Sequence, residues 1–73
     1  MGLGGNMKEN LQLVLMKIYA GNFGYSIYVL DNKTRKYIEI EKMTVGEKEK
    51  YIVNEVRIND MLMRYEIYVT KEK

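Results

Sequence analysis

The chain has 73 residues, which is room for one domain, and a fold of this size buries only about 60% of the surface that its unfolded chain exposes. Cysteine and histidine are both absent, which excludes a disulfide framework and a zinc site built from thiolate or imidazole ligands. Twelve basic and ten acidic residues give a net charge of +2, far from the excess expected of a protein that coats duplex nucleic acid.

The composition also bears on where the protein works. The absence of cysteine is typical of a reducing cytoplasm, and no apolar run is long enough to span a membrane, so we expect a cytoplasmic protein with no membrane partner. The richness in Lys, Glu, Ile and Tyr resembles that of hyperthermophile proteins. We expect a flexible leader over residues 1–6, followed by a single small strand-rich domain over residues 7–73.

Residues 7–20 fit two different periodicities. As a helix, the segment has Asn6 as its N-cap, Gly21 at its end and five apolar residues on one stripe. That stripe consists of Met7, Leu11, Val14, Leu15 and Ile18. As a strand, the segment places Val14, Met16 and Ile18 on one face and three leucines on the other. We favour the strand, because the connection after it is short and every later element is a strand.

Two alternating runs follow, Tyr25 to Leu30 and Lys36 to Glu41, with a polar stretch between them. This pattern predicts a β-hairpin with a loop from Asn32 to Arg35, in which Val29 faces Ile38. The charged stretch over residues 43–50 then predicts an exposed connection.

The clearest pattern begins at Tyr51, where apolar and polar residues alternate as far as Val69. Two strands are predicted, joined by a two-residue turn at Asn59-Asp60. Counting outward from that turn pairs Ile58 with Met61 and Val56 with Met63.

These elements together predict a mainly β fold, a small five-stranded antiparallel meander curled into a barrel or sheet. The alternative is an α+β fold in which one N-terminal helix packs on a four-stranded antiparallel sheet. The conformation of residues 7–20, strand or helix, decides between these two folds.

The residues that most enzymes use as nucleophile or base are missing, so we expect no catalytic residues, no cofactor and no metal site. Glu39 and Glu41 are the best pair of carboxylates, but alternating glutamates on a strand usually form a solvated face. The carboxylates of Glu47 and Glu49 have neighbouring lysines that neutralise them, which argues against a metal there.

Aromatic and basic residues form the one constellation that suggests binding. Tyrosines on a sheet face can stack on a partner while Lys and Arg contact its charges, and the predicted registers place several of each away from the apolar face. The candidate binding residues are Tyr28, Tyr37, Lys33, Arg35, Lys36, Arg57 and Arg64. The same registers also turn Tyr51 and Tyr68 away from the core.

The sequence therefore predicts a small non-catalytic domain for protein interaction or self-assembly, as a homo-oligomer or as an accessory subunit of a larger complex. Self-association is expected because a chain this short lacks disulfides and metal sites that would otherwise support it. The alternative is a β-domain that binds single-stranded nucleic acid with its aromatic and basic face.

Overall fold

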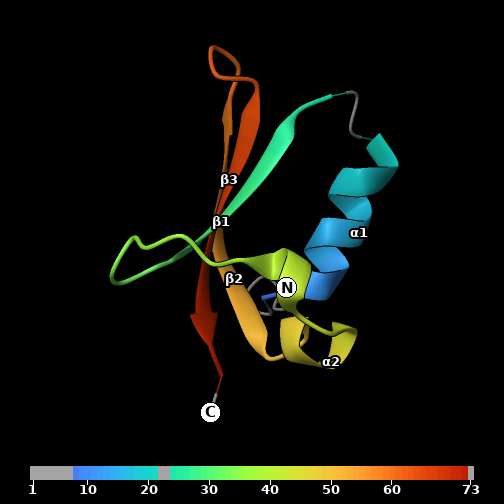
Figure 1. Cartoon of the computed structure of the whole chain (residues 1–73), viewed down its shortest axis with the longest axis vertical. Coiled ribbons are helices and arrows are strands. Elements are labelled where there is room, and N and C mark those ends of the chain that lie inside the picture. The colour runs from blue at the N-terminus through green and yellow to red at the C-terminus, as the bar shows by residue number, and fades with distance from the viewer. Residues whose placement is uncertain (1–7, 22–23, 73) are drawn as a thin grey trace, which may run out of the picture.

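The residues that the structure describes, 8–21 and 24–72, form two α-helices and a three-stranded sheet in this computed structural model. In chain order the elements are α1 (Leu11–Gly21), β1 (Ser26–Asp31), a 3-10 helix η1 (Ile40–Lys42), α2 (Val45–Lys48), β2 (Tyr51–Asn59) and β3 (Arg64–Lys71). The strand order is β1-β3-β2, and α1 lies along one side of the sheet (Figure 1). No helix in this part of the chain is long and apolar enough to cross a membrane.

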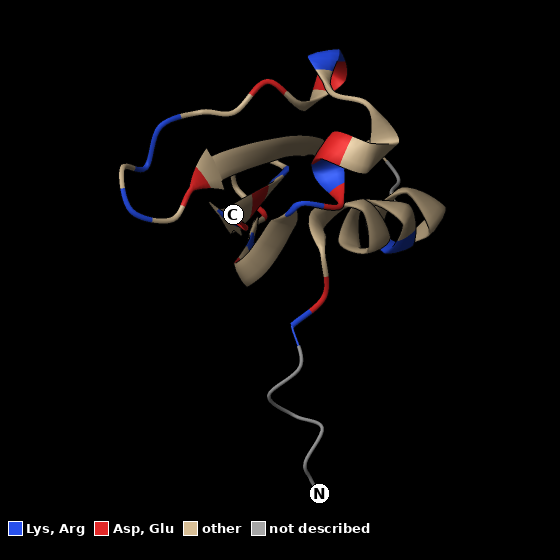
Figure 2. Cartoon of the chain, turned by 90° about the horizontal axis from the view of Figure 1, so that it is seen from below, with Lys and Arg blue, Asp and Glu red and all other residues tan. Residues whose placement is uncertain are grey.

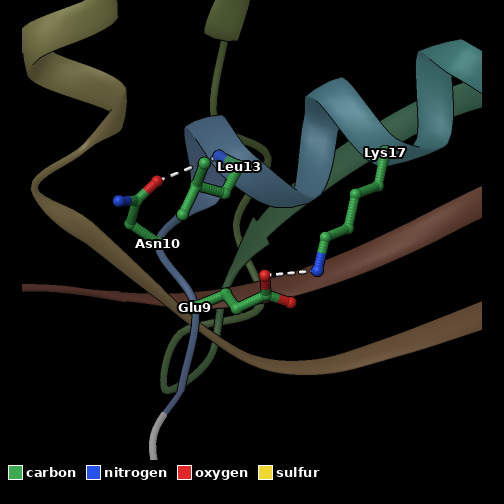
Figure 3. Close-up of polar contacts among 4 residues, drawn as sticks. All are labelled: Glu9, Asn10, Leu13 and Lys17. Atoms are coloured by element: carbon green, nitrogen blue, oxygen red, sulfur yellow. Dashed lines mark hydrogen bonds and ion pairs between the residues drawn. The ribbon is translucent and has the colours of Figure 1, made fainter.

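The N-terminal segment is a helix, so the strand that we favoured there is wrong. Asn10 is the N-cap of α1, since its side-chain oxygen accepts a hydrogen bond from the backbone N–H of Leu13 at 3.0 Å (Figure 3). The helical stripe is confirmed at Leu11 and Leu15, which are both buried. A strand would have separated these leucines from the rest of the core. The predicted cap Asn6 and the predicted leader lie outside the described residues.

The sheet is mixed and three-stranded, so neither the five-stranded meander or barrel nor the four-stranded antiparallel sheet is correct. β3 pairs with β1 in parallel and with β2 antiparallel. The predicted hairpin after β1 forms only at its start, where Leu30 bridges to Tyr37 and Ile38 donates to the carbonyl of Val29 at 2.8 Å. The chain then leaves the sheet, and η1 carries Ile40 into the core.

The hairpin of β2 and β3 is confirmed, but its predicted register is wrong. Asn59 pairs with Arg64, so the loop contains four residues and not a two-residue turn. The side-chain oxygen of Asn59 accepts a hydrogen bond from the N–H of Leu62 at 2.9 Å, and Met63 closes the loop with a φ of 52°. The longer loop places Val56 opposite Ile67, a buried residue of the central strand.

A β-bulge interrupts β2 at Asn54, between Val53 and Glu55. The extra residue changes which side of the sheet the alternating residues occupy. Tyr51 and Val53 therefore pack against the core, whereas Glu55 points to the other side. This is why the prediction for Tyr51, which assumed an unbroken alternation, is wrong.

The core lies between α1 and one face of the sheet. Its buried members come from the helix, from both parallel strands and from η1, and they are Leu11, Leu15, Val29, Ile40, Ile67 and Val69. Between the core and β2, the expected exposed connection contains the short helix α2. Thr44 and Glu47 form a capping box there, with hydrogen bonds of 3.2 and 2.9 Å between each side chain and the other residue's N–H.

Candidate binding surface

The face of the sheet that points away from α1 carries most of the predicted binding residues. Successive residues of a strand point to opposite sides, so the buried side chains of Ile67 and Val69 on the helix side leave Tyr68 on the other. Both views of the molecule place α1 and the turn after β1 on opposite sides of the sheet (Figures 1 and 2). We call the side away from α1 the open face.

Tyr68 lies at the centre of the open face, on the middle strand. Two guanidinium groups cover its ring, that of Arg35 at 4.6 Å from the ring centre and that of Arg57 at 5.5 Å. These distances are within the range of cation-π interactions. Because the two arginines lie over it, Tyr68 is only 8% exposed although no helix in the described residues packs on this face.

A second aromatic group lies beside it, at the β1 edge. The rings of Tyr28 and Tyr37 meet edge to face with their centres 5.9 Å apart. The guanidinium of Arg64 lies 4.8 Å from the centre of the Tyr28 ring. Tyr28 and Tyr37 remain 40% and 49% exposed, so both rings have surface to offer to a partner.

Two carboxylates hold the arginines of β2 and β3 in place. The Nε atom of Arg57 lies 2.8 Å from a carboxylate oxygen of Glu55, and that of Arg64 lies 2.8 Å from one of Glu66. The hydrogen bond to Glu55 raises the pKa of Arg57 above its usual value, so this guanidinium keeps its charge. The two ion pairs orient the guanidinium planes over the rings.

Arg35 reaches the open face from a tight turn after β1. The carboxylate of Asp31 accepts hydrogen bonds from the N–H groups of Thr34 and Lys33, both at 2.9 Å. These bonds hold the pKa of Asp31 below its usual value of 3.8. Arg35 closes the turn with a φ of 63°, a left-handed conformation that is unfavourable for residues other than glycine.

Carboxylates lie close to the arginines and to one of the rings of the open face. Partial burial raises the pKa of Tyr37, and the negative charges of Glu41 and then Glu39 raise it further, so carboxylates lie close to this ring. Two of the three arginines on this face are also paired with carboxylates, Arg57 with Glu55 and Arg64 with Glu66.

Five of the seven predicted binding residues therefore come together: Tyr28, Tyr37, Arg35, Arg57 and Arg64. Lys33 and Lys36 lie in the turn, and in the described residues no contact joins their side chains to the rings. Sequence reasoning placed Tyr68 on this side but did not include it among the binding residues, and it missed Glu66. The signal for Glu66 was its position two residues after Arg64, which puts both on one side of a strand.

The carboxylates considered for catalysis or metal binding form no site in the described residues. Glu39 forms an exposed ion pair with Lys42 at 3.4 Å. Residues 8–21 and 24–72 contain no group of three or more Asp and Glu side chains that could hold a metal ion.

Comparison with protein-family models, with curated proteins and with solved structures finds no match to this chain.

Proposed function

We propose that this chain is a non-catalytic protein-interaction domain and that the open face is its contact surface. The observation that carries the proposal is the gathering of Tyr28, Tyr37 and Tyr68 with three arginines on a sheet face that no helix covers in the described residues. Tyrosine and arginine are the residues that are enriched in the energetic centres of protein interfaces. Tyrosine rings have few rotatable bonds and lose little conformational freedom on binding, and Arg57 and Arg64 are already held by Glu55 and Glu66.

The ion pairs on the open face favour a protein partner over a nucleic acid. A surface that neutralises phosphates needs an excess of cations, because the release of condensed counterions supplies much of the binding free energy. On the open face Arg57 and Arg64 already pair with Glu55 and Glu66. A phosphate would therefore meet two arginines whose positive charge a neighbouring carboxylate already compensates.

A single strand of nucleic acid is the second candidate. It is supported by the exposed rings of Tyr28 and Tyr37 next to Arg64, since bases stack on aromatic rings on small sheets. Lys33 and Lys36 in the neighbouring turn could contact the backbone. This candidate uses the same surface, so the two are separated by what binds and not by where.

An enrichment experiment tests the proposed function. The purified domain is immobilised, and nuclease-treated extract from its natural host is passed over the wild type, over Tyr28→Ala/Tyr37→Ala and over Tyr19→Ala. Tyr19 is a matched control, because it is 58% exposed on α1, away from the open face. A protein retained by the wild type and by the control but lost from the double variant supports the proposal. Equal retention by all three places the contact elsewhere.

A titration tests the second candidate. Labelled single-stranded oligonucleotides are added to the wild type at low and at moderate salt, and binding is followed by fluorescence anisotropy. If nucleic acid is the partner, log affinity falls linearly with log salt by about 0.7 per neutralised phosphate. Binding should then also weaken in Lys33→Ala/Arg35→Ala/Lys36→Ala. We expect no binding with this signature.

A further inference from the structure

β2 is an edge strand whose outer side is only partly occupied. At its start the segment before α1 runs alongside, where Asn10 bridges to Ile52 and the N–H of Val53 donates to the carbonyl of Glu9 at 3.0 Å. Beyond this point, residues 54–59 have no backbone partner on that side among the described residues. Such an edge is a template for another strand.

The pairing within the sheet shows which backbone groups point outward. The carbonyl of Val69 accepts a hydrogen bond from Asn32 at 2.8 Å, so this residue of β3 turns its peptide groups toward β1. Its neighbour Tyr68 turns toward β2, where its partner is Glu55. Because the direction alternates along an antiparallel pair, Val56 and then Ile58 present their N–H and C=O groups to the free edge.

We propose that two copies of this chain associate by antiparallel pairing of β2 with β2, with Val56 on the two-fold axis. In this register Glu55 of each copy lies opposite Arg57 of the other, and these oppositely charged residues are already on the same side of the sheet. Two cross-strand ion pairs result, which stabilise antiparallel strands. The outward N–H and C=O groups of Val56 in the two copies complete a hydrogen-bonded pair at the axis.

The neighbouring registers are less favourable for physical reasons. Centring the pair on Arg57 would bring the two arginines face to face, and centring it on Glu55 would do the same with two carboxylates. A shift by a single residue would place the apolar Val56 beside Arg57 of the second copy. It would also put the α1 helices of the two copies on opposite sides of the joined sheet. Of these registers, the one with Val56 on the axis pairs opposite charges and keeps the apolar side chains of both copies on one side of the sheet.

The proposed pairing also covers apolar surface that is otherwise exposed. A groove of about 410 Å³ lies between α1 and this edge, lined by Val14, Ile18, Val53, Val56 and four polar or charged residues. Those four are Glu9, Lys17, Asn54 and Glu55, and the ion pair of Glu9 with Lys17 is shown in Figure 3. In the proposed register Ile58 of the second copy, 59% exposed in the single chain, lies beside Asn54 at this groove.

The proposed dimer uses the edge of the sheet and a second copy of the same chain, whereas the partner of the proposed function binds the open face. Both copies keep α1 on the same side, so their open faces join into one larger surface. Dimerisation is measured on the purified protein without a partner, so the failure of one proposal leaves the other standing.

Charge reversal tests the register. We expect the wild type to be a dimer by sedimentation velocity, and Glu55→Arg and Arg57→Glu each to weaken dimerisation by about tenfold or more, since both ion pairs become like-charge contacts. An equimolar mixture of the two single variants should form a heterodimer, because both pairs between residues 55 and 57 are again between opposite charges. The double variant Glu55→Arg/Arg57→Glu should dimerise like the wild type.

Lys42→Glu is the matched control, because it reverses one charge of the exposed ion pair with Glu39 away from this edge. It should leave the dimer unchanged, and circular dichroism checks that all variants fold. A wild type that stays monomeric up to millimolar concentration overturns the proposal. So does a dimer that neither single variant weakens, or single variants that remain monomers when mixed.

Discussion

The guanidinium of Arg35 lies 4.6 Å from the centre of the Tyr68 ring, so a residue in the turn after β1 covers a residue of the central strand. To do so, Arg35 adopts a φ of 63°, which a glycine adopts without strain. The contact thus requires the turn to hold an arginine in a backbone conformation that its side chain disfavours. Strain of this kind persists where the surrounding structure enforces it.

A pair of substitutions separates the backbone of Arg35 from its side chain. Arg35→Gly and Arg35→Ala both remove the cover over Tyr68, but only glycine relieves the left-handed conformation. We expect the glycine variant to have a free energy of unfolding higher than that of the alanine variant by about 0.5–1 kcal/mol. Urea denaturation measures the difference. An alanine variant as stable as the glycine variant would show that the turn does not hold this residue at positive φ.

Leu15 and Leu13 test the helical assignment of the N-terminal segment. Leu15 is 2% exposed in the core, whereas Leu13 on the same helix is 45% exposed. We expect Leu15→Ala to lower the free energy of unfolding by about 2–5 kcal/mol and Leu13→Ala by no more than about 0.5 kcal/mol. A strand would turn both leucines to one side, so similar losses in the two variants would contradict the helix.

The N-cap of α1 gives a more local test. Asn10→Ala removes the oxygen that accepts from the N–H of Leu13 and should cost about 0.5–2 kcal/mol in the free energy of unfolding. Asn10→Asp keeps an acceptor and should restore most of this loss. If aspartate is no better than alanine in chemical denaturation, the side chain at this position does not cap the helix.

The acid stability of the protein should depend on Asp31. Its pKa is below 3.8 in the folded chain because the backbone N–H groups of Thr34 and Lys33 bind its charged form. A carboxyl with a lowered folded pKa contributes stability that is complete above the unfolded pKa and is lost as pH falls through the folded pKa. Thermal unfolding should therefore show Asp31→Asn to be less stable than the wild type near neutral pH. The difference in melting temperature between the variant and the wild type should become smaller in strong acid. A difference that stays constant with pH would contradict this role of Asp31.

The sequence predicts the strands better than it predicts their partners. Alternation around Val56 and Ile67 identifies both strands of the hairpin, because local periodicity reflects burial. The parallel pairing of β1 with β3 joins segments far apart in the chain, and no local pattern marks it. No sequence pattern marks the bulge at Asn54 either. Because of this bulge, Tyr51 faces the core although Arg57 in the same strand faces the open face.

The N-terminal segment shows why a short apolar run is ambiguous. Leu11, Leu13 and Leu15 fit a strand, and Leu11 with Leu15 fit a helix equally well, so tertiary packing makes the choice. The capping box of Thr44 and Glu47 was readable from the sequence, since Thr-x-x-Glu is a signature of a helix start, but the charged run after it favoured a loop. Alternation places Tyr28 and Arg64 each away from the apolar side of its strand, but the parallel pairing of β1 with β3 brings them together. The position of Arg35 over Tyr68 does not follow from alternation, because it depends on the turn.

Photocrosslinking from the open face tests the central claim most directly. Benzoylphenylalanine replaces Tyr28 in one variant and Tyr19 on α1 in another, both are irradiated in the natural host, and the crosslinked material is identified by mass spectrometry. We predict a discrete protein adduct from position 28 that is absent from position 19. Adducts to nucleic acid from position 28, or the same adducts from both positions, would contradict a protein contact on the open face.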